Sequence, residues 1–194
     1  MSEQSRVFIA ALQISLDGYI QGADGEVDWV DSWNGALDLV PDVDAAVVGG
    51  GMYPGYEQLW GSIAADPKSG STMLGREATD GEVEYARWTQ GTPHYVLSTT
   101  LDKVNGESAH LVRDVGELRS LKEQPGGAIY VIGGAALVSS LMNEGLIDEL
   151  RLIVHPIILG GGKALFAGVR NRQRLELAQS RADRSGRVIL TYRI

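Results

Sequence analysis

The chain has 194 residues, no cysteine and a formal net charge of −8, which is typical of a single domain whose core is large enough to fold without disulfides. The absence of cysteine excludes disulfides, cysteine-ligated zinc and thiol nucleophiles, and so acidic a surface disfavours a nucleic-acid partner. No apolar run reaches the roughly 18 residues of a membrane span, and no basic start resembles a secretory signal, so we expect a cytoplasmic protein that binds neither nucleic acid nor membrane.

The first half of the chain alternates short apolar segments with turn signals, as expected for buried strands. A helix is expected over 29–40, because the pattern stops before Pro41, and a second helix begins near Pro54. Residues from about 61 to 91 show weak periodicity, which predicts a long loop with one short helix over 82–88. The segments that we expect to form strands here are 7–16, 44–48 and 94–98.

The second half of the chain repeats the pattern of strand, glycine and helix more clearly. Asp114 and Glu117 have capping-box spacing, which predicts a helix that buries Leu118 and Leu121. A second helix is expected over 135–143. The strands predicted here are 128–132 and 150–158, followed by 175–181 and 187–194, which alternate at period two and form an antiparallel hairpin.

This order of elements predicts an α/β fold. Repeated strand–helix–strand units imply right-handed crossovers and a mixed, mostly parallel central sheet. Wholly apolar strands such as 128–132 imply helices on both faces of that sheet. We therefore predict one domain over residues 1–194, with three layers and a C-terminal antiparallel hairpin.

Glycines end several predicted strands, and Gly133-Gly134 is the sharpest candidate site. This pair separates a buried strand from a helix, whose N-terminus offers unpaired N–H groups and a partial positive charge to a phosphate. Gly49-Gly50-Gly51 has the same form, and two such turns favour a ligand that carries phosphates at two places. A tight turn without a ligand is the alternative for each. Neither turn has the G-x-G-x-x-G or Walker pattern.

Other polar residues near predicted strand ends have two interpretations. Asp17 lies before Gly18 and either binds substrate or caps the turn. Ser98 and Thr99 follow a strand, where they either bind phosphate or ribose hydroxyls or serve ordinary turn chemistry. Lys163 follows three glycines that we expect mainly to redirect the chain, although its ammonium is able to contact an anion.

Histidine chemistry is not indicated. The three histidines lie far apart in sequence and lack the spacing of a metal site, so no metal is predicted. His155 alternates with Val154 and is expected to be a half-buried strand residue.

Taken in order, several segments resemble the dihydrofolate-reductase-like superfamily. The resemblance runs from about Phe8 to Tyr192 and is most specific to the reductase domain of the bacterial bifunctional deaminase-reductase of riboflavin synthesis and its stand-alone relatives. The segments that carry it are SLDGYI at 15–20, residues 44–51, VLST at 96–99, VIGG at 131–134, LIDEL at 146–150, HP at 155–156 and LGGGKALF at 159–166.

The resemblance implies an NADPH-dependent reductase that transfers a hydride to a small heterocyclic substrate, of the 5-amino-6-(5-phosphoribosylamino)uracil reductase type. It also implies that Gly133, Gly134 and Ala135 hold the pyrophosphate and the nicotinamide ribose. The turn at 49–51 would open the second phosphate-binding helix. Dihydrofolate reductase and a non-catalytic dinucleotide-binding module are the alternatives.

Further site residues follow from the same resemblance. Ser98 and Thr99 would lie near the adenosine phosphate. Ile14, Asp17 and Ile20 would border the nicotinamide and the substrate. Asp17 is then the candidate proton donor, with an ordered water as the alternative.

The chain departs from the family pattern at the second glycine turn. Many relatives carry Arg or Lys where this chain has Gly50, and that residue can pair with the cofactor's phosphates. Arg76 or Arg87 are candidate substitutes, and NADH or a deazaflavin remains an alternative cofactor. The segment 53–60 has no arginine to hold a ribose phosphate, which argues against the riboflavin intermediate itself.

The chain has no clear counterpart of the carboxylate that dihydrofolate reductases use. Dihydrofolate reductases use a carboxylate after the first loop, and neither Asp28 nor Asp31 is a convincing match for it.

Family members often form homodimers, and the apolar strand over 150–158 is the candidate dimer surface.

Overall fold

A computed structural model of the chain describes residues 6–30, 36–69 and 75–194. The strands are β1 (Phe8–Ser15), β2 (Tyr19–Gln21), β3 (Val43–Gly49), β4 (His94–Leu97), β5 (Ala109–Val112), β6 (Ala128–Ile132), β7 (Glu149–His155), β8 (Lys163–Ala164), β9 (Glu176–Ala182) and β10 (Val188–Arg193). The helices are α1 (Tyr53–Ala65), α3 (Asp80–Gly91), α4 (Val115–Lys122) and α5 (Ala135–Asn143), with short 3-10 turns η1 (Leu37–Leu39) and η2 (Pro67–Ser69).

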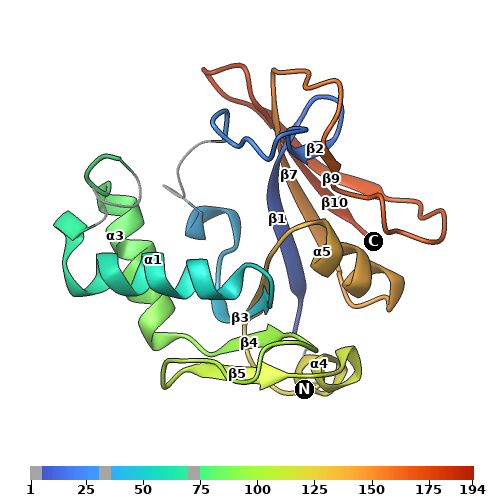
Figure 1. The fold of residues 1–194 in the computed structure, drawn as a ribbon. Coiled ribbons are helices and arrows are strands. Elements are labelled where there is room, and N and C mark those ends of the chain that lie inside the picture. Colours follow the sequence, from blue (N-terminus) through green and yellow to red (C-terminus); the bar gives the residue numbers. More distant parts are fainter. Residues whose placement is uncertain (1–5, 31–35, 70–74) are drawn as a thin grey trace.

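Most strands belong to one large sheet, which helices cover on both faces (Figure 1). The described residues form eight strands in the order β5-β4-β3-β6-β1-β7-β10-β9, together with a small sheet of β2 and β8. Successive side chains of a strand point to opposite faces. Val47 therefore packs under α4 and α5, whereas its neighbour Val48 packs under α1 and α3. The predicted three-layer α/β architecture is confirmed.

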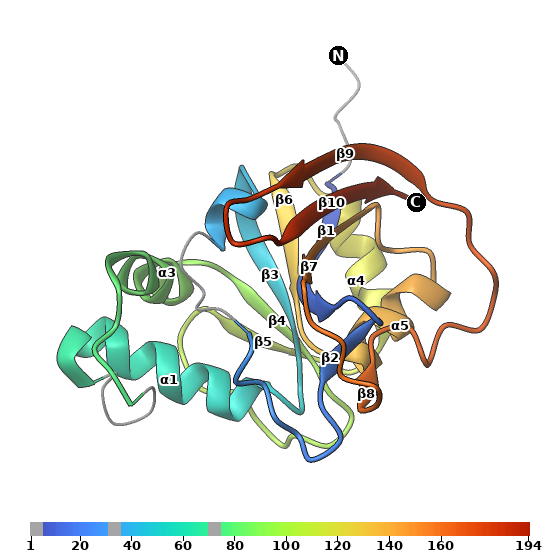
Figure 2. The same cartoon turned by 90° about the horizontal axis from the view of Figure 1, so that it is seen from above.

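The strand directions determine at which edge of the sheet a ligand is expected to bind. The strands from β5 across to β7 run parallel, so their carboxyl ends share that edge, where ligands bind in open α/β sheets. β10 runs antiparallel to β7, with Val188 opposite Val154 and Arg193 opposite Glu149. The turn of the β9–β10 hairpin therefore lies at the same edge, beyond β7 (Figure 2).

The segment expected to be a long loop contains more helix than predicted. α1 continues to Ala65, and α3 starts at Asp80 rather than at residue 82. A complete capping box between Thr79 and Glu82 starts α3, so Asp80 and Gly81 occupy its first turn instead of forming a separate turn. The predicted loop over 61–91 is therefore wrong in extent.

Three other segments differ from expectation. β5 was not predicted, and it extends the sheet by pairing with β4. The helix expected over 29–40 is represented in the described residues by η1 only, and Asp31 lies outside them. β7 ends at His155 and is paired on both edges, with β1 and β10. The predicted homodimer has no support from that strand and stays a prediction.

In the part of the chain that the structure describes, no helix has the length and apolar character needed to cross a membrane.

Candidate functional site

A large cavity lies along the carboxyl edge of the sheet. Its volume is about 590 Å³, within the range of about 300–1,000 Å³ that holds small molecules and cofactors. Its floor comes from β1, β7 and β10, and η1 contributes the opposite wall. Gly133 and Gly134 line one end, which we call the glycine end, and Arg181, Asp183 and Arg187 line the other, the hairpin end. β1 and β7 lie between β6 and the hairpin, so the two ends are well separated.

The two glycine turns meet at the glycine end. The backbone nitrogen of Gly49 lies 3.5 Å from the position that a Cβ on Gly133 would take. The same Cβ would lie 2.7 Å from Cδ2 of Leu137, so a side chain at 133 would collide with α5. Glycine at 133 is therefore required by the packing of the first turn against α5 and the second turn, which lie side by side. The Cβ position of Gly51 meets nothing within 4 Å, so backbone beside this contact is accessible to a closely approaching phosphate.

The helices that follow these turns have open N-termini. α1 begins after Met52 and α5 after Gly134, and neither has a side-chain cap or an acidic residue in its first turn. α3 and α4, by contrast, are closed by capping boxes at Thr79 and Asp114, with acidic residues in the first turn. The open N–H groups and positive helix ends thus lie where the turns converge, and they fit the phosphates of a dinucleotide.

Lys163 adds a positive charge to the glycine end. β8 pairs with β2, with Lys163 opposite Gln21, and this brings the lysine Nζ within 3.9 Å of the Cβ position of Gly134. Gly162 has φ +125°, and a side chain there would collide with the carbonyl oxygen of Gln21. The glycine triplet redirects the chain, as expected, and it also positions the lysine. Ile20 lies 3.5 Å from the same Cβ position and lines the cavity.

Gly50 packs against the end of β4, which explains its lack of a side chain. A Cβ on Gly50 would lie 2.6 Å from Oγ of Ser98, so no Arg or Lys fits there without a shift. The Ser98 hydroxyl accepts hydrogen bonds from the N–H groups of Thr100 and Leu101, at 3.2 and 3.1 Å. These contacts match the turn-chemistry interpretation of Ser98, and Thr99 beside it is exposed. The phosphate-binding role of both residues stays a prediction.

A cation that sequence reasoning missed lies beside this second turn. Nη1 of Arg113 donates to the carbonyl oxygen of Ser98 at 3.0 Å. Arg76, one of the expected substitutes, is instead paired with Glu82 at 2.8 Å, and Arg87 is exposed on α3. Arg113 follows β5, the strand that was not predicted, so its proximity had no signal in the sequence.

Asp17 is held by the loop that follows β7. Its carboxylate accepts hydrogen bonds from Oγ of Ser15 at 2.7 Å and from the N–H groups of Gly160 and Leu159, at 2.8 and 3.2 Å. These bonds, chiefly the one from Ser15, lower the pKa of Asp17 below its ordinary value. Asp17 is not among the described residues that line the cavity. The turn-capping interpretation describes these contacts, and the catalytic role stays a prediction.

The remaining predicted residues divide between the cavity and the core. Gly133 and Gly134 line the cavity. Ala135 is buried behind them at the start of α5. Ile14 is buried in the cluster under α4 and α5, on the other face of β1 from Gln13, which lines the cavity.

Gln13, a polar residue of the cavity floor, was not predicted, and it contacts a buried histidine behind the lining. Oε1 of Gln13 lies 2.7 Å from Nε2 of His155, and the ring of Trp29 meets the histidine edge-on at 5.3 Å. His155 is buried rather than half-buried, and burial lowers its pKa, although the nearby Asp183 acts in the opposite direction. Asp38, on η1, contributes an exposed carboxylate to the cavity lining.

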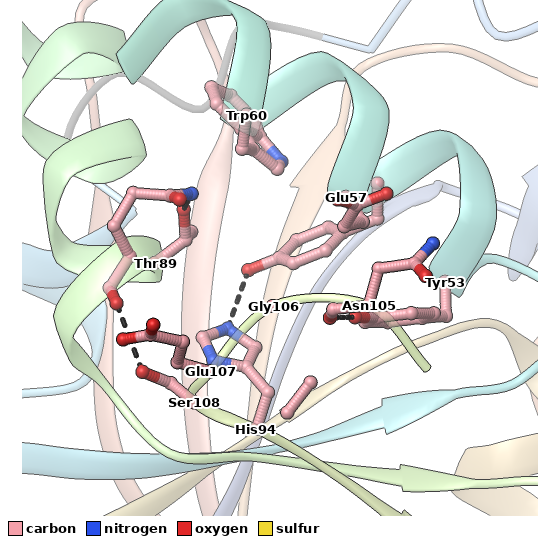
Figure 3. A pocket seen from close by; sticks show the side chains of 12 residues that line it. Tyr53, Glu57, Trp60, Thr89, His94, Asn105, Gly106, Glu107 and Ser108 are labelled. Atoms are coloured by element: carbon pink, nitrogen blue, oxygen red, sulfur yellow. Dashed lines mark hydrogen bonds between the residues drawn. The ribbon is translucent and has the colours of Figure 1, made fainter. Parts of the chain in front are cut away.

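A second cavity, between α1, α3 and β4, is too small for a cofactor, with a volume of about 70 Å³ (Figure 3). Nδ1 of His94 lies 2.7 Å from the carbonyl oxygen of Thr92, so Nδ1 carries the proton and Nε2 accepts from the Tyr56 hydroxyl at 3.1 Å. Tyr85 continues the network at 3.0 Å from the Tyr56 hydroxyl. Burial lowers the pKa of His94. These groups satisfy one another inside the core.

The acidic and histidine side chains of the described residues form no cluster of three that could hold a metal ion.

Comparison with known proteins agrees with this geometry. Residues 6–189 match the family model of the RibD C-terminal domain. The uncharacterized protein YyaP of Bacillus subtilis (strain 168) is 33% identical over 192 residues, covering 97% of this chain and 95% of its own.

Solved structures agree on the fold. A putative riboflavin biosynthesis protein from Shewanella sp. PV-4 superimposes with a TM-score of 0.68 at 23% identity, covering 96% of this chain and 98% of the other. The dihydrofolate reductase of Enterococcus faecalis, solved as a complex with NADP(H), superimposes with a TM-score of 0.57 at 14% identity, covering 96% and 95%. The fold is therefore dihydrofolate-reductase-like, as the resemblance implied, and the chain belongs to the RibD C-terminal domain family.

Proposed function

We propose that this protein is an NADPH-dependent reductase that transfers a hydride to a small heterocyclic substrate, of the 5-amino-6-(5-phosphoribosylamino)uracil reductase type. The observation that carries the proposal is the glycine end of the cavity. There the two glycine turns lie side by side, the helices that follow them have uncapped N-termini, and Lys163 lies beside Gly134. Membership of the RibD C-terminal domain family supports a reductase, and the NADP(H) complex of the Enterococcus faecalis enzyme supports the cofactor class.

The residues of the site would bind the phosphates of the cofactor and line the space beside it. The turns at 49–51 and 133–134, with Lys163, would hold the phosphates of the dinucleotide. The bound nicotinamide supplies the hydride. Apolar groups of the cavity, such as Ile20, Ile153 and Ile189, line the space where cofactor and substrate would meet.

The preference for NADPH is proposed to come from Arg113. A 2′-phosphate is the feature that distinguishes NADPH from NADH, and a guanidinium binds phosphate through paired hydrogen bonds. Arg113 lies at the end of β5, beside Ser98 and the second glycine turn. It supplies the positive charge that the chain lacks at Gly50.

The proton that completes the reduction is proposed to come from water. The hydrogen bonds of Asp17 stabilise its ionised form, which makes this carboxyl group a poor proton donor near neutral pH. The cavity is open to solvent beside exposed residues such as Asp38. Water is therefore the donor that the geometry favours over Asp17.

A thermal-shift titration with NADPH and NADH tests the cofactor, and NADPH oxidation with pyrimidines, pterins and dihydrofolate tests the reaction. A dinucleotide at about 100 times its Kd stabilises the fold by roughly 2.7 kcal/mol. No shift with either dinucleotide would overturn the proposal. Binding without oxidation against any substrate would favour a non-catalytic module, and rapid turnover of dihydrofolate alone would identify a dihydrofolate reductase.

A further inference from the structure

The hairpin end of the cavity combines an apolar floor with a guanidinium group. Arg181 of β9 lies directly opposite Ile189 of β10, and Ile189 lies opposite Ile153 of β7. Residues opposite one another on neighbouring strands share a face of the sheet, and all three line the cavity. The charge of Arg181 therefore belongs to the same surface that would support a substrate ring.

Asp183, a carboxylate that also lines the hairpin end, is bonded within the hairpin itself. Oδ1 of Asp183 accepts hydrogen bonds from the N–H and hydroxyl of Ser185, at 2.8 and 2.6 Å, and from the N–H of Arg187 at 3.2 Å. Its Oδ2 lies 2.7 Å from Nε and 2.6 Å from Nη2 of Arg187. These contacts fix the hairpin turn and leave Asp183 little capacity for a further partner.

Arg181 is exposed and makes no ion pair or side-chain hydrogen bond within residues 6–30, 36–69 and 75–194. The pKa of Asp183 is lowered chiefly by its hydrogen bond from Ser185, and the positive charge of Arg181 is close enough to help lower it, but no direct contact joins the side chains of Arg181 and Asp183. Asp38, the other carboxylate that lines the cavity, comes from η1 on the opposite wall. In a chain of net charge −8, a guanidinium whose N–H groups make no side-chain contact at a mainly apolar cavity is a selective feature, because it attracts anions that the rest of the surface repels.

We propose that Arg181 receives an anionic group of the substrate, a carboxylate or a phosphate, while the substrate ring lies over Ile153 and Ile189. This inference rests on the proposed function and assigns Arg181 as the residue that would hold the anion attached to its heterocyclic substrate. The site is separate from the phosphate-binding turns, because β1 and β7 lie between β6 and the hairpin. A guanidinium matches either anion, since both accept paired hydrogen bonds.

The test compares ligands that share a ring and differ in charge, using calorimetric Kd values with and without NADPH. Pterin-6-carboxylate against 6-hydroxymethylpterin tests a carboxylate, and uridine monophosphate against uridine tests a phosphate. We expect at least one anionic ligand to bind about fivefold or more tightly than its neutral partner. Arg181→Gln should remove that difference, and Arg181→Lys should keep part of it. Arg184→Gln, which removes the same charge from the hairpin turn outside the cavity lining, should leave it intact.

The outcomes are distinct from those of the proposed function. Equal binding within both pairs would overturn the inference even if NADPH binds, and so would equal losses in Arg181→Gln and Arg184→Gln, which would indicate diffuse electrostatics. If none of the four ligands binds, the substrate class is wrong. If only one of the two pairs shows a preference for the anionic ligand, that pair identifies the anion as a phosphate or a carboxylate. The thermal-shift titration with NADPH and NADH, made without these ligands, shows separately whether the dinucleotide binds.

Discussion

The ammonium group of Lys163 lies 3.9 Å from the Cβ position of Gly134, at the open N-terminus of α5. Two sheets create this relationship, because β6 delivers the glycine and the β2–β8 pair delivers the lysine. The helix end and the lysine thus present their positive charge to one space.

Replacing Lys163 should therefore weaken dinucleotide binding. We expect Lys163→Gln to raise the Kd for NADPH and NADH alike by roughly fivefold, the effect of about 1 kcal/mol at an exposed site. Lys103→Gln removes the same charge from an exposed loop and should change neither Kd. Equal effects of the two substitutions, measured by fluorescence titration, would contradict a specific contact.

Adjacent glycines in the second turn should respond differently to the same change. Gly50→Ala places a methyl group 2.6 Å from Oγ of Ser98, and we expect about 1–3 kcal/mol of destabilisation from such overpacking, with weaker dinucleotide binding. A Cβ on Gly51 meets nothing within 4 Å, so the free energy of unfolding of Gly51→Ala should be close to that of wild type. The free energy of unfolding of both variants, measured with denaturant, checks this. An unchanged value for Gly50→Ala would mean that the residues at the end of β4 shift at little cost.

Arg113 should control the choice between the two dinucleotides. Arg113→Gln is expected to raise the Kd for NADPH by about fivefold relative to that for NADH, because the guanidinium would contact the extra phosphate. Arg87→Gln is the matched control, since Arg87 is exposed on α3. Parallel losses for NADPH and NADH in Arg113→Gln would show instead that this residue only supports the turn at Ser98.

The buried histidines should make the protein less stable in mild acid. Burial lowers the pKa of His94 and of His155 below the ordinary value of 6.5, so the unfolded chain binds protons that the folded chain resists. Their stabilising contribution is complete above about pH 6.5 and is lost as the pH falls from there toward the folded pKa values. Tm measured from pH 8 to pH 5 should fall, and the fall should be smaller in His94→Gln. His110→Gln, at an exposed position, should leave the profile unchanged, and a similar effect of both would refute this assignment.

Asp17→Asn should separate turn capping from catalysis. We expect NADPH oxidation to be retained, because Asp17 lies outside the cavity lining among the described residues, while Tm falls at neutral pH. The pKa of Asp17 is lowered from 3.8, so its contribution is present above that value and is lost as the pH falls below it. The Tm difference between variant and wild type should therefore shrink in acid. Lost turnover with an unchanged Tm would establish Asp17 as the proton donor instead.

The elements that sequence patterns predicted well are those with strong local signals. The apolar run before Gly133 gave β6, and the alternating segments around residues 183–186 gave the hairpin, because periodicity reports which faces are buried. α3 was shortened because Asp80-Gly81 resembles a turn, although Thr79 and Glu82 carry the capping-box spacing. β5 was missed because it has four residues and exposes His110.

The site was less predictable, since its charged members meet through long-range pairing. Nothing near Arg113 in the sequence indicates Ser98, and nothing near Arg181 indicates Ile153. The sheet order brings these residues together, and sequence periodicity does not encode that order. Asp17 was singled out from its position in the chain, whereas the loop after β7 determines its bonding.

The antiparallel return of β10 has a consequence for how such proteins diversify. It brings a hairpin turn to the edge where the parallel strands end, yet this turn shares no residue with the glycine turns that would hold the dinucleotide. Under the proposed assignment of Arg181, mutations at positions 181–187 would alter substrate choice and leave the glycine turns unchanged. One scaffold would in this way keep its reductant and acquire new substrates through changes in a single exposed hairpin.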